Sequence, residues 1–157
     1  MTSIVPLGEA DLAVSLPECE VTVCEPPGGT PVDPAEAAND AMAAPHGDSL
    51  ADVAAADDDV AIVVTDVTRA TPDDVLVDAL VADLQAAGVD RSQVTIVLGL
   101  GLHRPMTDAE IEAGLGAYAD LAENHDPERT VPVGSIEGVP IEINETVAEA
   151  DLVVSTG

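Results

Sequence analysis

The sequence predicts an α/β protein with a Rossmann-like, mostly parallel sheet that is flanked by helices and followed by a C-terminal β-hairpin. β-branched apolar runs typical of strands buried on both faces occur at Val60–Thr65 and again from Val94. Segments with helical periodicity and capping residues follow each run. This strand–helix–strand alternation implies right-handed crossovers and a mostly parallel sheet. We expect residues 1–157 to form a single domain.

One strand and one helix are expected in the N-terminal part. The alternating residues of Cys19–Cys24 favour a strand, and the Pro- and Gly-rich residues after them indicate a turn. A helix is expected over Pro34–Ala44, with proline at its first position. On a strand, Cys19 and Cys24 would face opposite sides, which predicts two unpaired, buried or half-buried thiols in a reducing cytoplasm.

The first central helix has clear end signals. Thr71 is expected to cap it, with Pro72 at its first position and Asp74 at its third, and Gly88 to end it in the left-handed conformation. The apolar stripe consists of Leu76, Val77, Leu80, Val81 and Leu84, and the polar face of Asp73, Asp74, Asp78 and Gln85.

Further elements are expected towards the C-terminus. Thr107 and Glu110 form a capping box for a second helix that runs to about Ala122. A hairpin turning at Glu137–Gly138 is followed by a short helix and the strand Asp151–Gly157. The fold is therefore expected to be incomplete, because it ends directly after a strand.

The charge balance is extreme, with 31 acidic residues, four arginines, no lysine and a net charge of −27. The chain lacks a basic footprint for nucleic acid, and an anionic membrane surface would repel it. The acidic residues are spread over helix faces and loops, which predicts a hydrated, halophilic surface. No signal peptide or membrane-spanning run is visible, so a cytoplasmic location is expected.

Polar side chains follow two neighbouring strands of the expected sheet. In parallel α/β sheets, ligands bind outside the carboxyl ends of the strands. The first strand is followed by Asp66, Thr68 and Arg69, and the second by His103 and Arg104. Each group precedes a helix N-terminus, which favours anions. Because the two arginines are half of all the cations in the chain, they indicate an anionic ligand.

Spacing alone leaves other interpretations open. They are a turn cap for Asp66, an ion pair with a neighbouring carboxylate for Arg69, and an ordinary loop position for His103. His125 stands close to the expected end of the second helix, where the dipole favours histidine with or without a function. His46 lies in a loop. The glycine-containing run before His103 lacks the third glycine and the lysine of a phosphate-binding fingerprint, which counts against a generic phosphate binder.

Four motifs occur in order along the chain: DVTRATP at residues 66–72, GLHRPMTDAEI at 101–111, NHDPE at 124–128 and NETVAEADLVVSTG at 144–157. Together they resemble the N-terminal part of the lactate racemase family, and the resemblance extends from about Leu16 over nearly the whole chain. It implies an isomerase that racemises 2-hydroxy acids such as lactate with a nickel-pincer nucleotide.

The resemblance also implies roles for single residues. His103 matches one of the family's two acid/base histidines. An imidazole suits this role because its ordinary pKa lies near the working pH. Arg69 matches the arginine that binds the substrate carboxylate, and Asp66 an aspartate that orders the cofactor or substrate site. The other candidate residues are Arg104 for substrate, Thr68 and Thr71 for cofactor, and His125.

Two departures from the family pattern predict an incomplete enzyme. Leu102 stands where the family usually has threonine, which removes a hydroxyl next to the base. The family's second histidine, its nickel-binding histidine and its cofactor lysine would lie beyond Gly157, and this chain contains no lysine. We expect a C-terminal portion or a companion subunit to complete the site. The alternative is a remnant or half of a split enzyme that binds a small acid or nucleotide without turnover.

The charge predicts a strong dependence of stability on salt. With no Phe or Trp and one Tyr, the core must consist of small and β-branched side chains, so self-repulsion competes with a small free energy of folding. We expect marginal folding below ~0.1 M salt and a steep gain towards molar salt, where the screening length shortens to ~3 Å. Thermal unfolding, monitored by circular dichroism at several salt concentrations, measures this dependence. An unfolding midpoint that does not change with salt contradicts the prediction.

Overall fold

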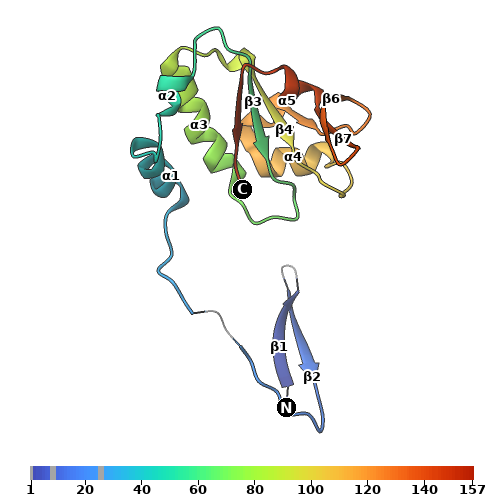
Figure 1. Cartoon of the computed structure of the whole chain (residues 1–157). Coiled ribbons are helices and arrows are strands. Elements are labelled where there is room, and N and C mark those ends of the chain that lie inside the picture. The colour runs from blue at the N-terminus through green and yellow to red at the C-terminus, as the bar shows by residue number, and fades with distance from the viewer. Residues whose placement is uncertain (1, 8–9, 25–26) are drawn as a thin grey trace. The chain divides into compact units, whose positions relative to one another are not determined.

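Figure 1 shows a computed structural model of the chain, in which residues 2–7, 10–24 and 27–157 are described. The chain divides into two compact units, Met1–Pro31 and Val32–Gly157. That the whole chain forms one domain stays a prediction.

The first unit is built on an antiparallel hairpin that the sequence analysis missed. Strands β1 (Thr2–Leu7) and β2 (Ala10–Ser15) pair along their lengths, with Val5 opposite Leu12. The expected strand at Cys19–Cys24 is wrong, because this segment is irregular. Both of its thiols are free, as predicted, but exposed rather than buried. Alternation by itself does not make a strand, since the extended backbone also needs a hydrogen-bonded neighbour.

The second unit contains the predicted parallel sheet. Its four strands lie in the order β5-β4-β3-β8, and every neighbouring pair is parallel. They are β3 (Val60–Val64), β4 (Val94–Leu98), β5 (Ala122–Asn124) and β8 (Leu152–Ser155). The two central strands, β3 and β4, are the two apolar runs from which the fold class was predicted.

The second unit also contains five α-helices: α1 (Pro34–Ala43), α2 (Leu50–Val53), α3 (Asp73–Ala87), α4 (Asp108–Leu115) and α5 (Glu145–Glu149). Helix α3 contacts α1, α2 and α4 (Figure 1). Helix α1 begins on proline as predicted, and α2 was not expected.

Among the described helices, none combines the length and the apolar character that crossing a membrane requires.

The predicted C-terminal hairpin is present. It consists of β6 (Thr130–Ile136) and β7 (Val139–Asn144), which pair antiparallel. The turn residues Glu137 and Gly138 both have positive φ, 52° and 82°. Two positive φ values match the right-handed twist of hairpin strands, which explains the turn at this dipeptide.

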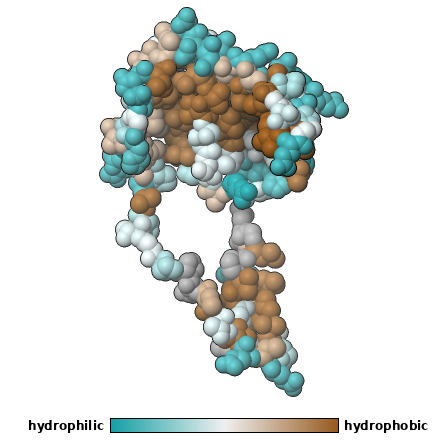
Figure 2. Space-filling view, viewed as in Figure 1, coloured by the Kyte–Doolittle hydropathy of each residue, from teal (hydrophilic) through white to brown (hydrophobic). Residues whose placement is uncertain are grey.

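The core packs one face of the sheet against α3 and α4. Its largest fully buried side chains are Ile62, Leu84, Ile96, Leu98 and Leu115. Among the acidic residues that the structure describes, Asp66 and Asp73 are buried and the others are at least partly exposed. In Figure 2 an apolar area, brown, lies in the middle of the visible face of the second unit, and hydrophilic residues border it.

The start of α3 differs from the prediction. The helix begins at Asp73, Pro72 is the flanking residue, and no side chain caps the end. Instead, the Asp73 N–H donates to the backbone oxygen of Thr71 at 2.9 Å. Asp73, expected on the polar face, is buried because its side chain turns towards threonines distant in sequence. The other end is as predicted, with Gly88 in the left-handed conformation at φ 104°.

Helix α4 begins with the predicted capping box of Thr107 and Glu110 but ends earlier than expected. It stops at Leu115, and a 3₁₀ segment, Gly116–Leu121, leads into β5. The expected end at Ala122 is wrong because this residue is the first of β5 and pairs with β4. Tertiary pairing thus overrides the local helical pattern.

Replacing Gly88 should destabilise the second unit. A Cβ atom at this position would lie 3.0 Å from the Cβ of Ala56, in a backbone conformation with positive φ. We expect Gly88→Ala to lower the free energy of unfolding by at least ~1 kcal/mol. The control is Gly114→Ala in α4, where a Cβ would meet nothing within 4 Å. It should raise stability by up to ~1 kcal/mol. Urea unfolding measures both, and equal effects of the two variants would contradict the prediction.

Candidate functional site

The loop after β3 is organised by Asp66. Its backbone oxygen accepts from the N–H of Arg69 at 3.0 Å, which closes a turn. Its Oδ1 accepts from the backbone N–H of Thr68 at 3.0 Å and from the Thr68 hydroxyl at 2.6 Å. Asp66 therefore does cap a turn, as one of the open interpretations held. The turn leaves Arg69 exposed.

The loop after β4 depends on its glycines. The N–H of Gly99 donates to the oxygen of Val64 at 2.9 Å, and an added Cβ would lie 3.2 Å from that oxygen. The next turn is closed by the N–H of His103, which donates to the oxygen of Leu100 at 2.9 Å. Gly101 adopts φ 56° inside this turn, a conformation that glycine takes without strain. The turn ends with a half-exposed His103 side chain.

The two loops meet in a hydrogen bond between the Nδ1 of His103 and the Oδ2 of Asp66. Hydrogen bonds from the Thr68 hydroxyl and from His103 lower the pKa of the Asp66 carboxyl from 3.8 to about 2. The carboxylate is thus ionised at neutral pH and can only accept, so the proton of the contact sits on Nδ1. In this tautomer of the neutral ring, Nε2 carries no proton and can accept one.

Both loops line one hollow of about 470 Å³ at the carboxyl edge of the sheet. Its walls include Asp66, Arg69, Leu102 and His103. The structure therefore brings three of the predicted site residues together. Leu102, beside His103, is fully exposed, at 104 %. An ionised acid, a base and an apolar side chain share this surface with a guanidinium group.

The four arginines are used differently. Three form ion pairs: Arg91 with Asp120, Arg104 with Glu110 and Arg129 with Glu145. Arg69 forms no ion pair with any residue that the structure describes. Its guanidinium group is therefore available to an external anion.

Arg104 lies next to His103 but is held by the start of α4. Its guanidinium group donates to both carboxylate oxygens of Glu110, at 2.8 and 2.7 Å. Hydrogen bonds from Arg104 and from Thr107 lower the pKa of Glu110 to about 2. Arg104 thus reinforces the capping box, and its role in substrate binding stays a prediction.

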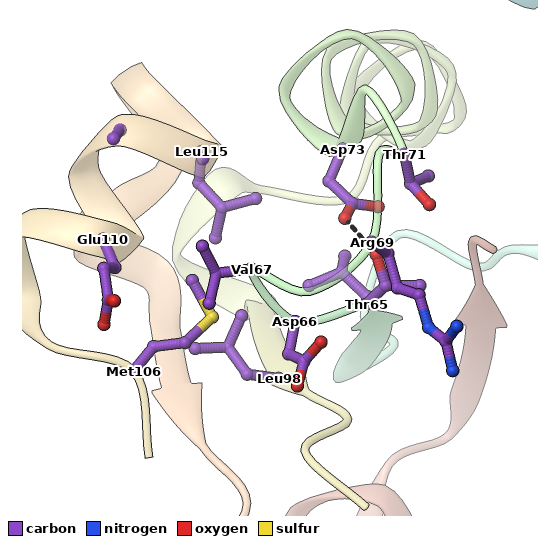
Figure 3. Close-up of a pocket in the computed structure, with 13 residues that line it drawn as sticks. Thr65, Asp66, Val67, Arg69, Thr71, Asp73, Leu98, Met106, Glu110 and Leu115 are labelled. Atoms are coloured by element: carbon purple, nitrogen blue, oxygen red, sulfur yellow. Dashed lines mark hydrogen bonds between the residues drawn. The ribbon is translucent and has the colours of Figure 1, made fainter. Parts of the chain in front are cut away.

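A second, mostly apolar cavity of about 240 Å³ lies between the β3 loop and α4. Figure 3 shows Val67, Leu98, Met106 and Leu115 around it, with the Arg69 guanidinium pointing away from these side chains. Thr71 also lines the cavity. No pattern in the sequence predicts this cavity, because its walls come from β3, β4, α3, α4 and the loops between them.

His125 lies outside both cavity walls. It follows β5 rather than a helix, which corrects the expected dipole contact, and its N–H donates to the oxygen of Leu98 at 3.2 Å. The Oδ1 of Asn144 accepts from the N–H of Val147 at 3.1 Å, so the amide nitrogen faces the Nδ1 of His125 at 3.3 Å. His46 is an exposed loop residue, as expected.

No three His, Cys, Asp or Glu side chains come together as a possible metal site within residues 2–7, 10–24 and 27–157.

The second unit is thus an α/β unit whose parallel sheet carries, at its carboxyl edge, a histidine, an ionised aspartate and an arginine that pairs with no described carboxylate. The lactate racemase N-terminal domain family matches residues 7–157, and the chain belongs to this family.

The similar proteins are longer than this chain. It is 29 % identical over 119 residues to the lactate racemase of Lactiplantibacillus plantarum, which covers 70 % of this chain and 27 % of that protein. The lactate racemase apoprotein from Thermoanaerobacterium thermosaccharolyticum superposes with a TM-score of 0.73 at 24 % identity, over 99 % of this chain and 38 % of that one. A Thermotoga maritima protein gives a TM-score of 0.54 at 20 % identity, over 78 % and 32 %. The first superposition confirms the predicted fold class.

The contact with Asp66 should fix the tautomer of His103. We expect the neutral ring to carry its proton on Nδ1, and Asp66→Ala to give the mixture of tautomers found in a free imidazole. Two-bond ¹H–¹⁵N NMR spectra distinguish the tautomers, and the exposed His46 provides an internal reference. A His103 tautomer that is the same in both proteins contradicts the prediction.

Proposed function

We propose that the chain supplies one acid/base histidine and the carboxylate-binding arginine of a 2-hydroxy acid racemase. The observation that carries this proposal is the shared hollow in which His103 contacts Asp66 while Arg69 forms no ion pair with a described residue. Membership of the lactate racemase N-terminal domain family supports lactate or a similar small 2-hydroxy acid as the substrate.

In this proposal the proton and the carboxylate are handled by separate residues. The Nε2 of His103 takes the proton of the substrate hydroxyl and later returns it. Asp66 keeps the other proton on Nδ1 and stabilises the imidazolium, which contributes to general base catalysis. Arg69 binds the carboxylate through two parallel N–H···O bonds, and this fork fixes C2 relative to the imidazole.

The family resemblance implies a nickel-pincer nucleotide that accepts hydride from C2 when it is bound. The residues of this chain do not fit the whole group. There is no lysine to attach it. Asp66 and Thr68, two expected contacts, already satisfy each other's hydrogen bonds. Of the expected contacts, Thr71 lines the apolar cavity, and its hydroxyl makes no hydrogen bond with any described residue.

The remaining groups are proposed to come from another portion of the protein or from a companion subunit. This chain spans 27 % of the Lactiplantibacillus plantarum enzyme and 38 % of the superposed chain, which leaves room for such a portion. We also propose that the protein works in a salt-rich cytoplasm. The net charge of −27 and the two free thiols support this setting.

A second candidate is a module that binds a small acid without turnover. Leu102 favours it, because a fully exposed leucine beside His103 offers an apolar contact but no proton-transfer group. The absence of lysine from the sequence also favours the binding module. Both candidates use Arg69 to bind the anion, and they differ in whether His103 moves a proton.

Substitution of His103 tests the proposal in the complete, cofactor-loaded protein. We expect His103→Gln to lower racemisation of at least one enantiomer by ~10²–10⁴, with fold and cofactor binding retained, because a general base is lost. Arg69→Lys keeps the charge but loses the fork, so the substrate should bind more weakly. Polarimetry from each lactate enantiomer measures the rates.

The matched controls are His46→Gln and Arg129→Lys, which change the same residue types away from the hollow. Both should leave racemisation unchanged. Near-normal rates in both directions for His103→Gln would refute its acid/base role. Lactate binding by the complete protein without any racemisation would favour the binding module.

A further inference from the structure

Asp73 is a buried carboxylate that the proposed proton transfer does not use. It is 8 % exposed and forms the first residue of α3. Its Oδ2 accepts from the hydroxyl of Thr65 at 2.7 Å (Figure 3), and its Oδ1 accepts from the hydroxyl of Thr156 at 2.7 Å. Each carboxylate oxygen thus accepts one hydrogen bond from a threonine hydroxyl.

These two bonds fasten together segments that are distant in sequence. Thr65 directly follows β3, and Thr156 directly follows β8. Thr156 is also held to β3 by its N–H, which donates to the oxygen of Val63 at 2.9 Å. Asp73 therefore joins the carboxyl ends of two neighbouring strands to the start of α3.

The bond to Thr65 also closes a loop. Residues 65–73 leave β3 and return to α3, and the Thr65–Asp73 bond joins the two ends of this loop. Inside it lies the turn that carries Asp66 and Arg69. Because Asp66 is the neighbour of Thr65, movement of Thr65 would displace the carboxylate that orients His103.

The contacts of Asp73 also help to explain why Arg69 forms no ion pair with a residue that the structure describes. The two buried carboxylates of this loop region are Asp66 and Asp73. Hydroxyl groups and the His103 ring occupy the oxygens of both. Neither has to recruit the guanidinium group to satisfy its buried charge, and the positive end of α3 adds to the stabilisation of Asp73.

We propose that Asp73 is a positioning residue of the candidate site, which holds the loop of residues 65–73 closed so that Asp66 meets His103 and Arg69 faces the anion. The identity of the anion rests on the proposed function. The proposed loop geometry does not rest on that function, because the tautomer of His103 reports the loop geometry without any ligand.

Asp73→Ala in the full chain tests this proposal, with Asp74→Ala as the matched control. The control removes the same charge from the next position of the helix, where the side chain is exposed. In Asp73→Ala we expect His103 to lose its preference for the Nδ1-protonated tautomer and lactate to bind at least ~10-fold more weakly, since small misplacements are costly. Asp74→Ala should change neither property. Amide exchange at Ile62 and Ile96 monitors the integrity of the sheet.

The outcomes separate the Asp73 proposal from the proposed function. An unchanged tautomer and unchanged lactate affinity in Asp73→Ala would overturn the positioning role, even if the melting temperature falls. If Asp73→Ala does not fold, Thr156→Val decides by the same two measurements, because it removes one hydroxyl and keeps the charge. A tautomer shift in a chain that never binds lactate supports the Asp73 role and contradicts the anion site. Lactate binding that persists in Asp73→Ala with an unchanged tautomer and unchanged affinity supports the anion site and contradicts the Asp73 role.

Discussion

The hydrogen bond between Asp66 and His103 is the contact on which the candidate site depends. It exists because β3 and β4 are parallel neighbours, with Val64 opposite Leu98, so that their following loops leave the sheet side by side. The bond gives His103 a defined proton position, and the turn that starts at Asp66 presents Arg69. If β3 and β4 were separated in the sheet, the same residues would form no common hollow.

The distribution of charge explains how so acidic a chain can carry this site. The described carboxylates stay at the surface except Asp66 and Asp73, which are satisfied by hydroxyl groups and an imidazole rather than by arginine. Charged hydrogen bonds of this kind offset desolvation without a fixed cation nearby. Three arginines form ion pairs at the surface, and the fourth, Arg69, pairs with no carboxylate in the described part of the chain. The few cations are thus divided between stability and the proposed anion site.

The superposed lactate racemase apoprotein places the fold in a larger context. The chain superposes over nearly its full length and covers 38 % of that structure. The proposed division of labour follows from this proportion and from the residues present. This part offers an imidazole and a guanidinium group, whereas the sequence contains no lysine such as the family resemblance implies.

Features that depend on neighbouring residues could be predicted from the amino-acid sequence. Strands β3 and β4, the left-handed Gly88, the capping box of α4 and the turn at Glu137–Gly138 were predicted because side-chain shape and local backbone preference fix them. The placement of polar residues at the carboxyl ends of the strands followed from strand direction alone.

Features that depend on partners distant in sequence became visible in the folded structure. The three-residue β5 exists because β4 pairs with it, and Asp73 is buried because hydroxyl groups 8 and 83 residues away bind it. The bond between Asp66 and His103 likewise joins residues 37 positions apart. A single sequence carries the propensity of each segment but not the geometry that brings two segments together, because a hydrogen bond forms only where the folded chain places donor and acceptor within reach.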